Sequence, residues 1–108
     1  MNTKNINASV SELKRVLNAY FGNKVELYLF GSTARNEYTS NSDIDILVLI
    51  SGEVKTALEE KVIDLAYDIE LEYDVVFGII VYSKEFWLSG KARVMPFHQN
   101  VQREALRI

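Results

Sequence analysis

Two aspartates, Asp43 and Asp45, stand one residue apart at the start of an apolar run that ends at Ile50. Alternate side chains of a strand project from the same face, so we expect these two carboxylates to lie side by side. Neighbouring carboxylates repel each other, and burying them without a partner costs free energy. Mg²⁺ would offset the repulsion, because this cation prefers carboxylate, phosphate and water oxygens as ligands. The pair therefore predicts a magnesium site, although Asp-x-Asp is also typical of a cap or a surface pair.

A second group of candidate residues, Gly31 and Ser32, follows an apolar run that ends at Phe30. Glycine allows a phosphate to approach the backbone, and Ser32 offers both its hydroxyl and its N–H. Residues 33–37 can form a helical turn whose N-terminus faces an anion. Arg35 either steadies a phosphate tail or pairs with a loop carboxylate. Taken alone, these residues also fit a plain turn with a surface cation.

A short connection brings the two groups together. Only about 13 residues separate the apolar run that ends at Phe30 from the run that starts at Ile44, so an antiparallel pair is favoured over a parallel crossover. This pairing places Gly31 and Ser32 beside the aspartates. Phosphates held there would offer oxygens to metal ions on the aspartates. Two bridging metal ions are a recurring arrangement for phosphoryl transfer.

Hydrophobic periodicity predicts the elements that position these residues. Alternating or continuous apolar residues predict three strands, at 25–30, 44–50 and 75–82. Apolar residues three or four apart predict helices. The first expected helix begins at Ser9, with Ser9 and Glu12 as a capping box, and stops near Gly22. A long helix is expected at about 53–72 and a short one at 84–88. A terminal helix is expected to have Pro96 in its first turn. A loop is expected at residues 89–92.

This order of elements predicts an α/β (α+β) fold, with helices packed on a short mixed sheet of about three strands. The chain has 108 residues, which is enough for one hydrophobic core and too few for a second module. We therefore expect a single domain that spans residues 1–108.

The charge pattern argues against a nucleic-acid partner. The net charge is −3, and ten of the fifteen acidic residues lie between positions 41 and 74. A general nucleic-acid binder would be basic, so direct nucleic-acid binding is not expected. The acidic stretch is either a solvated helix face or a surface for a basic partner protein.

Several classes of protein are disfavoured by features that the sequence lacks. No apolar run approaches the roughly 20 residues that cross a bilayer, so no membrane association is expected. The sequence contains no cysteine, which excludes disulfides and thiolate metal sites. The polar N-terminus has no signal-peptide core. A cytoplasmic location is therefore expected.

The residues from Gly31 to Asp45 resemble the motif of the nucleotidyltransferase superfamily that includes the DNA polymerase β palm. The resemblance is closest to the minimal nucleotidyltransferases (MNT family). Their pattern is Gly-Ser, ten residues and then Asp-x-Asp, which this sequence matches without a gap. The usual "ARGE" after Gly-Ser is present with Asn36 in place of glycine, and the Ser-Asp-Ile-Asp run is intact from Ser42. The resemblance implies a palm-like nucleotidyltransferase fold.

The same resemblance implies roles for individual residues. Gly31 and Ser32 would bind the β- and γ-phosphates of ATP, and Arg35 is a further nucleotide-binding candidate. Asp43 and Asp45 would hold two Mg²⁺. An acceptor hydroxyl would then attack the α-phosphate and release pyrophosphate.

Partners also follow from the resemblance. Minimal members commonly act as antitoxins beside a small all-helical HEPN-type protein, and some transfer AMP to a tyrosine of that partner. The resemblance therefore implies a Mg-dependent enzyme that uses ATP to adenylylate a hydroxyl on such a partner. Either a homo-oligomer or a hetero-oligomer is compatible with this role.

One position departs from the family pattern. Active members carry a third acid on the strand after the long helix, and alignment places that position at Gly78 or Ile79, neither of which can bind metal. The nearest acid is Asp74, which is a catalytic candidate if the strand register is shifted and otherwise a helix-end aspartate. Two alternatives therefore stay open. One is a weakly active or inactive binding module that neutralises its partner by contact, and the other is a small-molecule, antibiotic-type nucleotidyltransferase, which usually has a second domain for its acceptor.

Overall fold

The centre of the molecule is a four-stranded mixed sheet in the order β3-β2-β1-β4. The computed structural model describes residues 3–35, 37 and 43–108 of the chain. The strands are β1 (Val25–Phe30), β2 (Ile44–Ile50), β3 (Phe77–Ser83) and β4 (Leu106–Arg107). β1 is antiparallel to both β2 and β4, whereas β2 is parallel to β3. This topology confirms the α/β fold and the antiparallel pair expected from the short connection.

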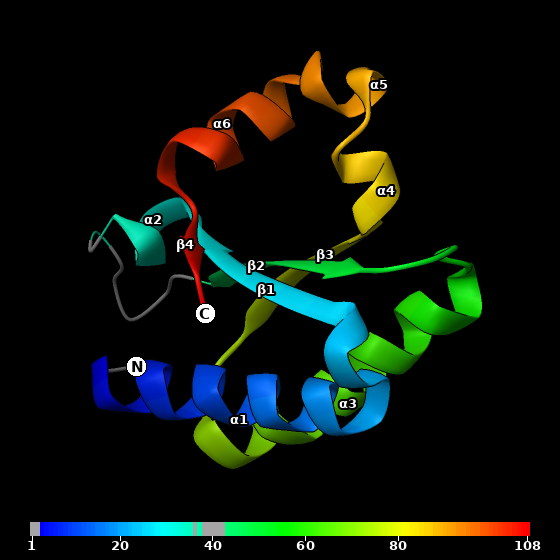
Figure 1. The fold of residues 1–108 in the computed structure, drawn as a ribbon. Helices are drawn as coiled ribbons and strands as arrows, with labels where there is room; N and C mark the ends of the chain where they lie inside the picture. The colour runs from blue at the N-terminus through cyan, green and yellow to red at the C-terminus, as the bar shows by residue number, and fades with distance from the viewer. Residues whose placement is uncertain (1–2, 36, 38–42) are drawn as a thin grey trace.

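The helices form one layer on each face of the sheet (Figure 1). The long helices α1 (Thr3–Phe21) and α3 (Thr56–Tyr73) cover one face, and the shorter α4 (Lys84–Trp87), α5 (Gly90–Arg93) and α6 (Pro96–Glu104) lie over the other. Short turns adjoin both ends of β1: the 3-10 turn η1 (Gly22–Lys24) precedes it and α2 (Gly31–Ala34) follows it. None of the helices in the described part of the chain has the length and apolar character needed to cross a membrane.

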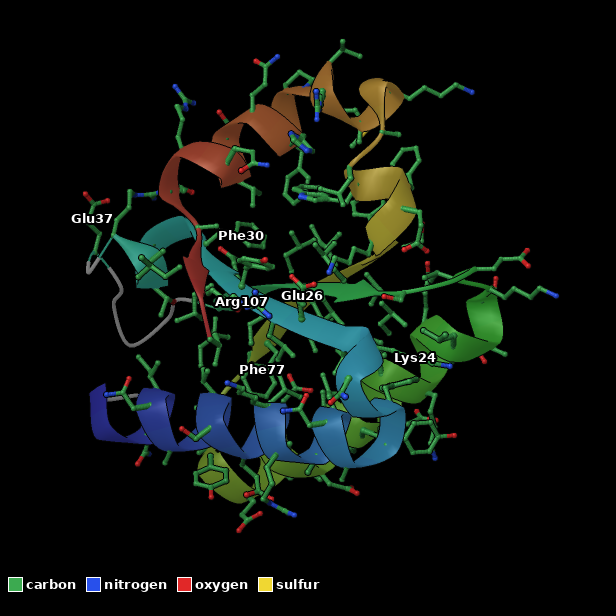
Figure 2. All side chains as sticks on the ribbon, in the orientation of Figure 1. Lys24, Glu26, Phe30, Glu37, Phe77 and Arg107 are labelled. Carbon is green, nitrogen blue, oxygen red and sulfur yellow. The ribbon has the colours of Figure 1, made fainter. Side chains whose placement is uncertain are left out.

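The hydrophobic core has two parts, one under each helical layer. Because alternate residues of a strand face opposite sides, β2 sends Ile46 toward α1 and α3 and sends Leu47 toward α4 and α6. Figure 2 shows the same division, with Phe77 on the side of α1 and Phe30 on the side of α6. The central strand β2 is therefore buried on both faces, which explains its nearly continuous apolar sequence.

The first helix differs from the prediction at its start. α1 begins at Thr3, so the predicted capping box at Ser9 and Glu12 is wrong. Ser9 is fully buried inside the helix, and its hydroxyl donates a hydrogen bond to the carbonyl oxygen of Ile6, 2.9 Å away. Ile6 is also buried, and the burial of this apolar side chain stabilises the additional helical turns.

Two short elements also differ from the expectation. The predicted loop at 89–92 contains the helical turn α5, which Ser89 caps by accepting the N–H of Ala92 at 3.4 Å. β4 follows α6 as a fourth strand, where the sequence predicted three, and it pairs Leu106 with Leu29. Neither element is long enough to show a hydrophobic period of its own.

Candidate active site

The two aspartates of the motif lie at the start of β2, on the face that carries α4 and α6. The sheet register places Asp45 between Phe30 on β1 and Gly78 on β3. A Cβ atom added to Gly78 would lie 2.8 Å from Asp45 Oδ1 and 3.9 Å from Asp43 Cβ. Both aspartate side chains therefore border Gly78, as the alternation of side chains along a strand predicts. Asp43 is exposed, whereas Asp45 is half-buried.

Gly31 lies directly against the carboxylate of Asp45. Its backbone has a φ of +69°, which L side chains rarely adopt. A Cβ added there would lie only 2.2 Å from Asp45 Oδ2, so the position excludes any side chain unless Asp45 moves. The helical turn expected at residues 33–37 begins at Gly31 itself, as α2. The sequence prediction that the glycine-serine turn lies beside Asp45 is thus confirmed by the geometry.

Some of the motif lies outside the described residues. Asn36 and Ser42, which the sequence motif includes, lie outside the described residues. The two ends of the motif, Gly31 and Asp45, are both described, and the close approach lies between them.

The carboxylate of Asp45 carries an electrostatic penalty. Burial is the largest factor that raises its pKa, and repulsion from Asp43 raises it further. Glu104 adds a smaller repulsion, while the positive charge of Arg35 acts in the opposite direction. A cation bound between Asp43 and Asp45 would relieve this penalty.

Arg35 pairs with carboxylates in this structure. Its Nη1 donates to Glu104 Oε2 at 2.7 Å, and its Nε donates to Glu37 Oε2 at 3.0 Å. Of the two roles that the sequence left open for Arg35, the structure thus contains the carboxylate pairing. The partner Glu104 comes from the end of α6, far from the motif in sequence.

Glu104 is a site residue that the sequence analysis missed. Its Oε1 accepts the backbone N–H of Gly31 at 3.0 Å, while Oε2 accepts from Arg35. These hydrogen bonds, first from Arg35 and then from Gly31, lower the pKa of the Glu104 carboxyl. No motif spacing marks this residue, because 73 positions separate it from Gly31.

Asp74, the candidate third acid, lies at the C-terminal end of α3. It is the C-cap of α3, in the left-handed conformation with a φ of 55°, and it is exposed. The described residues contain no group of three or more His, Cys, Asp or Glu side chains that could hold a metal ion. The position on β3 that lies beside Asp45 is occupied by Gly78.

The donor set of the site suits Mg²⁺. Asp43 and Asp45 supply hard carboxylate oxygens, and the glycines at positions 31 and 78 leave no side chain over Asp45. Mg²⁺ usually takes one or two carboxylates from a protein and completes its coordination with phosphate oxygens and water. Two carboxylates beside the turn at Gly31 and Ser32 fit that requirement.

Comparisons with known proteins agree with this geometry. Residues 10–101 match the family model described as "Nucleotidyltransferase domain". A Methanocaldococcus jannaschii protein named "Putative protein adenylyltransferase MJ0604" is 42% identical over 96 residues, which cover 85% of this chain and 89% of that protein.

Solved structures share the fold. A mutant MntA-HpeT toxin-antitoxin structure matches with a TM-score of 0.57 at 20% identity, over 92% of this chain and 70% of that one. A toxin-antitoxin structure with AMP-PNP matches with a TM-score of 0.56, also at 20% identity, over 93% and 69% of the two chains.

Proposed function

This chain belongs to the nucleotidyltransferase domain family, and we propose that it transfers AMP from ATP to a hydroxyl group of a partner protein. One observation carries the proposal: the Asp45 carboxylate packs against Gly31 and is repelled by the neighbouring carboxylate of Asp43. The relative of M. jannaschii, named as a protein adenylyltransferase, supports a protein as the acceptor.

Four residues of the site have a part in the proposed reaction. Gly31 and Ser32 would bind the β- and γ-phosphates, and Asp43 and Asp45 would hold two Mg²⁺ ions. Once bound, Mg²⁺ would supply positive charge that stabilises the attacking and leaving oxygens. The acceptor oxygen forms a bond to the α-phosphorus while the bond to the bridging oxygen breaks. The products are a phosphodiester, pyrophosphate and a proton.

The partner in this proposal is a small all-helical HEPN-type toxin, for which the chain acts as antitoxin. The fold likeness to toxin-antitoxin structures, one of them with AMP-PNP, supports this assignment. The surface of α3 supports it too, because Ile63, Tyr67 and Leu71 recur every fourth residue and are 47%, 57% and 65% exposed. Exposed acids such as Asp64 and Asp68 flank this apolar stripe. It therefore suits a partner with apolar residues surrounded by lysine and arginine.

The occupant of the third-acid position favours a second candidate function. Gly78 cannot bind metal, and its place beside Asp45 is the place where a third carboxylate would be most effective. The second candidate is a binding module that keeps the fold and nucleotide affinity but neutralises its partner by contact alone. Asp74 is the remaining third-acid candidate, and Asp74→Asn tests that role directly.

Labelled ATP decides between the two functions. The chain is incubated with α-labelled ATP, Mg²⁺ and the product of the neighbouring gene, and label on the partner is expected. Asp43→Ala/Asp45→Ala should abolish it, whereas a control that removes two acids elsewhere, Glu12→Ala/Glu53→Ala, should not. A wild-type chain that neutralises the partner without transferring label would overturn the enzyme and support the binding module.

A further inference from the structure

We propose that Glu104 acts as an internal anion, which competes with the phosphates of the nucleotide for the N–H of Gly31 and the guanidinium of Arg35. This inference rests on the proposed function and adds a residue that sets nucleotide affinity. It follows from the two contacts that Glu104 makes with Gly31 and Arg35.

Both carboxylate oxygens of Glu104 accept hydrogen bonds from groups that would otherwise be free to bind phosphate. Oε1 accepts the N–H of Gly31 at 3.0 Å, and Oε2 accepts from Arg35 Nη1 at 2.7 Å. An ionised carboxylate, like a phosphate, only accepts hydrogen bonds. A backbone N–H has one proton to give, so a phosphate that takes the N–H of Gly31 must displace Glu104 from it.

Charge makes the competition stronger. Glu104 and Asp45 approach Gly31 from two sides, the first at the N–H and the second at the position of a Cβ. A triphosphate that enters this turn would therefore meet two carboxylates as well as Asp43. Mg²⁺ would neutralise the aspartates, whereas Glu104 would keep its negative charge beside Gly31 and Arg35, so we expect Glu104 to move away when a triphosphate binds.

The position of Glu104 permits that movement. It is the last residue of α6, its side chain is 26% exposed, and the chain leaves the helix at Ala105. β4 begins at the next residue, Leu106, and pairs with Leu29 near the end of β1. When Glu104 leaves Gly31, the turn, α6 and β4 should therefore respond together.

Glu104→Gln provides the main test, because it removes the charge and keeps the shape. We expect Mg·ATP and inorganic triphosphate to bind roughly threefold to fivefold more tightly in calorimetry, the range that a partly exposed ion pair supports. A purely structural role for Glu104 would give weaker binding instead. Equal or weaker binding by a folded Glu104→Gln variant would overturn the inference, and Glu104→Ala serves as the second variant if Gln disturbs the turn.

A matched control exists at the other side of the molecule. Glu85 Oε1 accepts the backbone N–H of Gly52 at 2.6 Å, so Glu85→Gln removes the same charge from the same type of contact. Its affinity for triphosphate should equal that of the wild type. An equal gain in both variants would mean that net charge alone acts, and would overturn the specific role of Glu104.

A double-mutant cycle tests the competition for Arg35. If Glu104 and phosphate share this guanidinium, Arg35→Ala should weaken triphosphate binding more in the Glu104→Gln background than in the wild type. Equal losses in the two backgrounds would overturn the sharing.

Failure of the inference and of the proposed function give different results. If no variant binds Mg·ATP, the proposed function fails and this inference fails with it. If the wild type binds Mg·ATP and Glu104→Gln gains nothing, only this inference fails. The amide resonance of Gly31 gives an independent readout, since Glu104→Gln should shift it without nucleotide and triphosphate should shift it in the wild type.

Discussion

The two faces of the seven-residue strand β2 differ in composition: one is wholly apolar, and the other carries a carboxylate. On the face toward α1 and α3, Ile44 and Ile46 are completely buried and wholly apolar. On the opposite face, the carboxylate of Asp45 comes first and the buried side chain of Leu47 follows, so a charged group and core packing share this face. The apolar face holds the strand in place, and this allows a repelling carboxylate pair to persist on the other face. The comparison predicts that substitutions on the two faces change different properties.

The largest effect should come from the apolar face. Ile46→Ala removes fully buried volume, and we expect it to lower the free energy of unfolding by about 2–5 kcal/mol. Urea denaturation measures this free energy. The neighbouring substitution Asp45→Asn, on the opposite face of the strand, should cause no loss of stability. If the two variants lowered the free energy of unfolding by similar amounts, the proposed difference between the two faces would be wrong.

Gly31→Ala tests the contact between the turn and Asp45. At Gly22, with a φ of +67° and open space around a Cβ, alanine introduces only backbone strain, expected at about 1–2 kcal/mol. At Gly31, with a φ of +69°, the Cβ would also meet Asp45 at 2.2 Å, so the loss of stability should be larger. Gly31→Ala should in addition weaken Mg·ATP binding in calorimetry, whereas Gly22→Ala should not. Equal losses of stability at the two glycines would contradict the contact.

Gly78→Asp sharpens the comparison by adding a third carboxylate to the polar face. Without Mg²⁺ the added charge should destabilise the protein, on the order of 1 kcal/mol for a charge a few ångströms from Asp45. With Mg²⁺ the gain in melting temperature should exceed that of the wild type. Gly78→Asn, with the same size and no charge, is the control and should show no enhanced response to Mg²⁺. An identical Mg²⁺ response in both variants would show that position 78 does not reach the metal.

The parts that the sequence predicted are those whose signals are local. β1 and β2 were predicted with their observed bounds, because alternating or continuous apolar residues define a strand within six or seven positions. The contact of Gly31 with Asp45 was predicted as well, since a short connection forces an antiparallel pair.

The parts that the sequence did not predict depend on distant partners. The role of Glu104 requires the end of α6 to meet the turn after β1, and no periodicity or spacing encodes that meeting. β4 has two residues, too few for a pattern, and Ser9 carries a capping signal although the burial of Ile6 extends the helix past it. In each case tertiary packing decided the outcome, which a local pattern does not contain.

The smallest expected effect concerns the pH dependence of Asp45. Its pKa is raised in the folded protein, so the folded state holds a proton more tightly than the unfolded state does, and stability falls as the pH rises through these two values. Asp45→Asn should therefore be more stable than the wild type at pH 7, by less than about 1 kcal/mol because solvent screens the site. The difference should disappear below about pH 3.9, the pKa of an unperturbed aspartate.

Glu26 on the same face of β1 provides a control of the opposite sign. Its hydrogen bond to Lys84 lowers its pKa, and Figure 2 shows it beside Arg107, with which it forms a second ion pair at 3.7 Å. Glu26→Gln should thus lose stability at pH 7, and this loss should vanish as the pH falls through the lowered pKa. Urea denaturation between pH 3 and pH 7 measures both variants. The effect of substitution on the free energy of unfolding should therefore change with pH in opposite directions for Glu26 and Asp45, because Glu26 lies beside cations and Asp45 lies beside another carboxylate. If both effects changed with pH in the same direction, Asp45 would carry no electrostatic penalty that a bound cation could relieve.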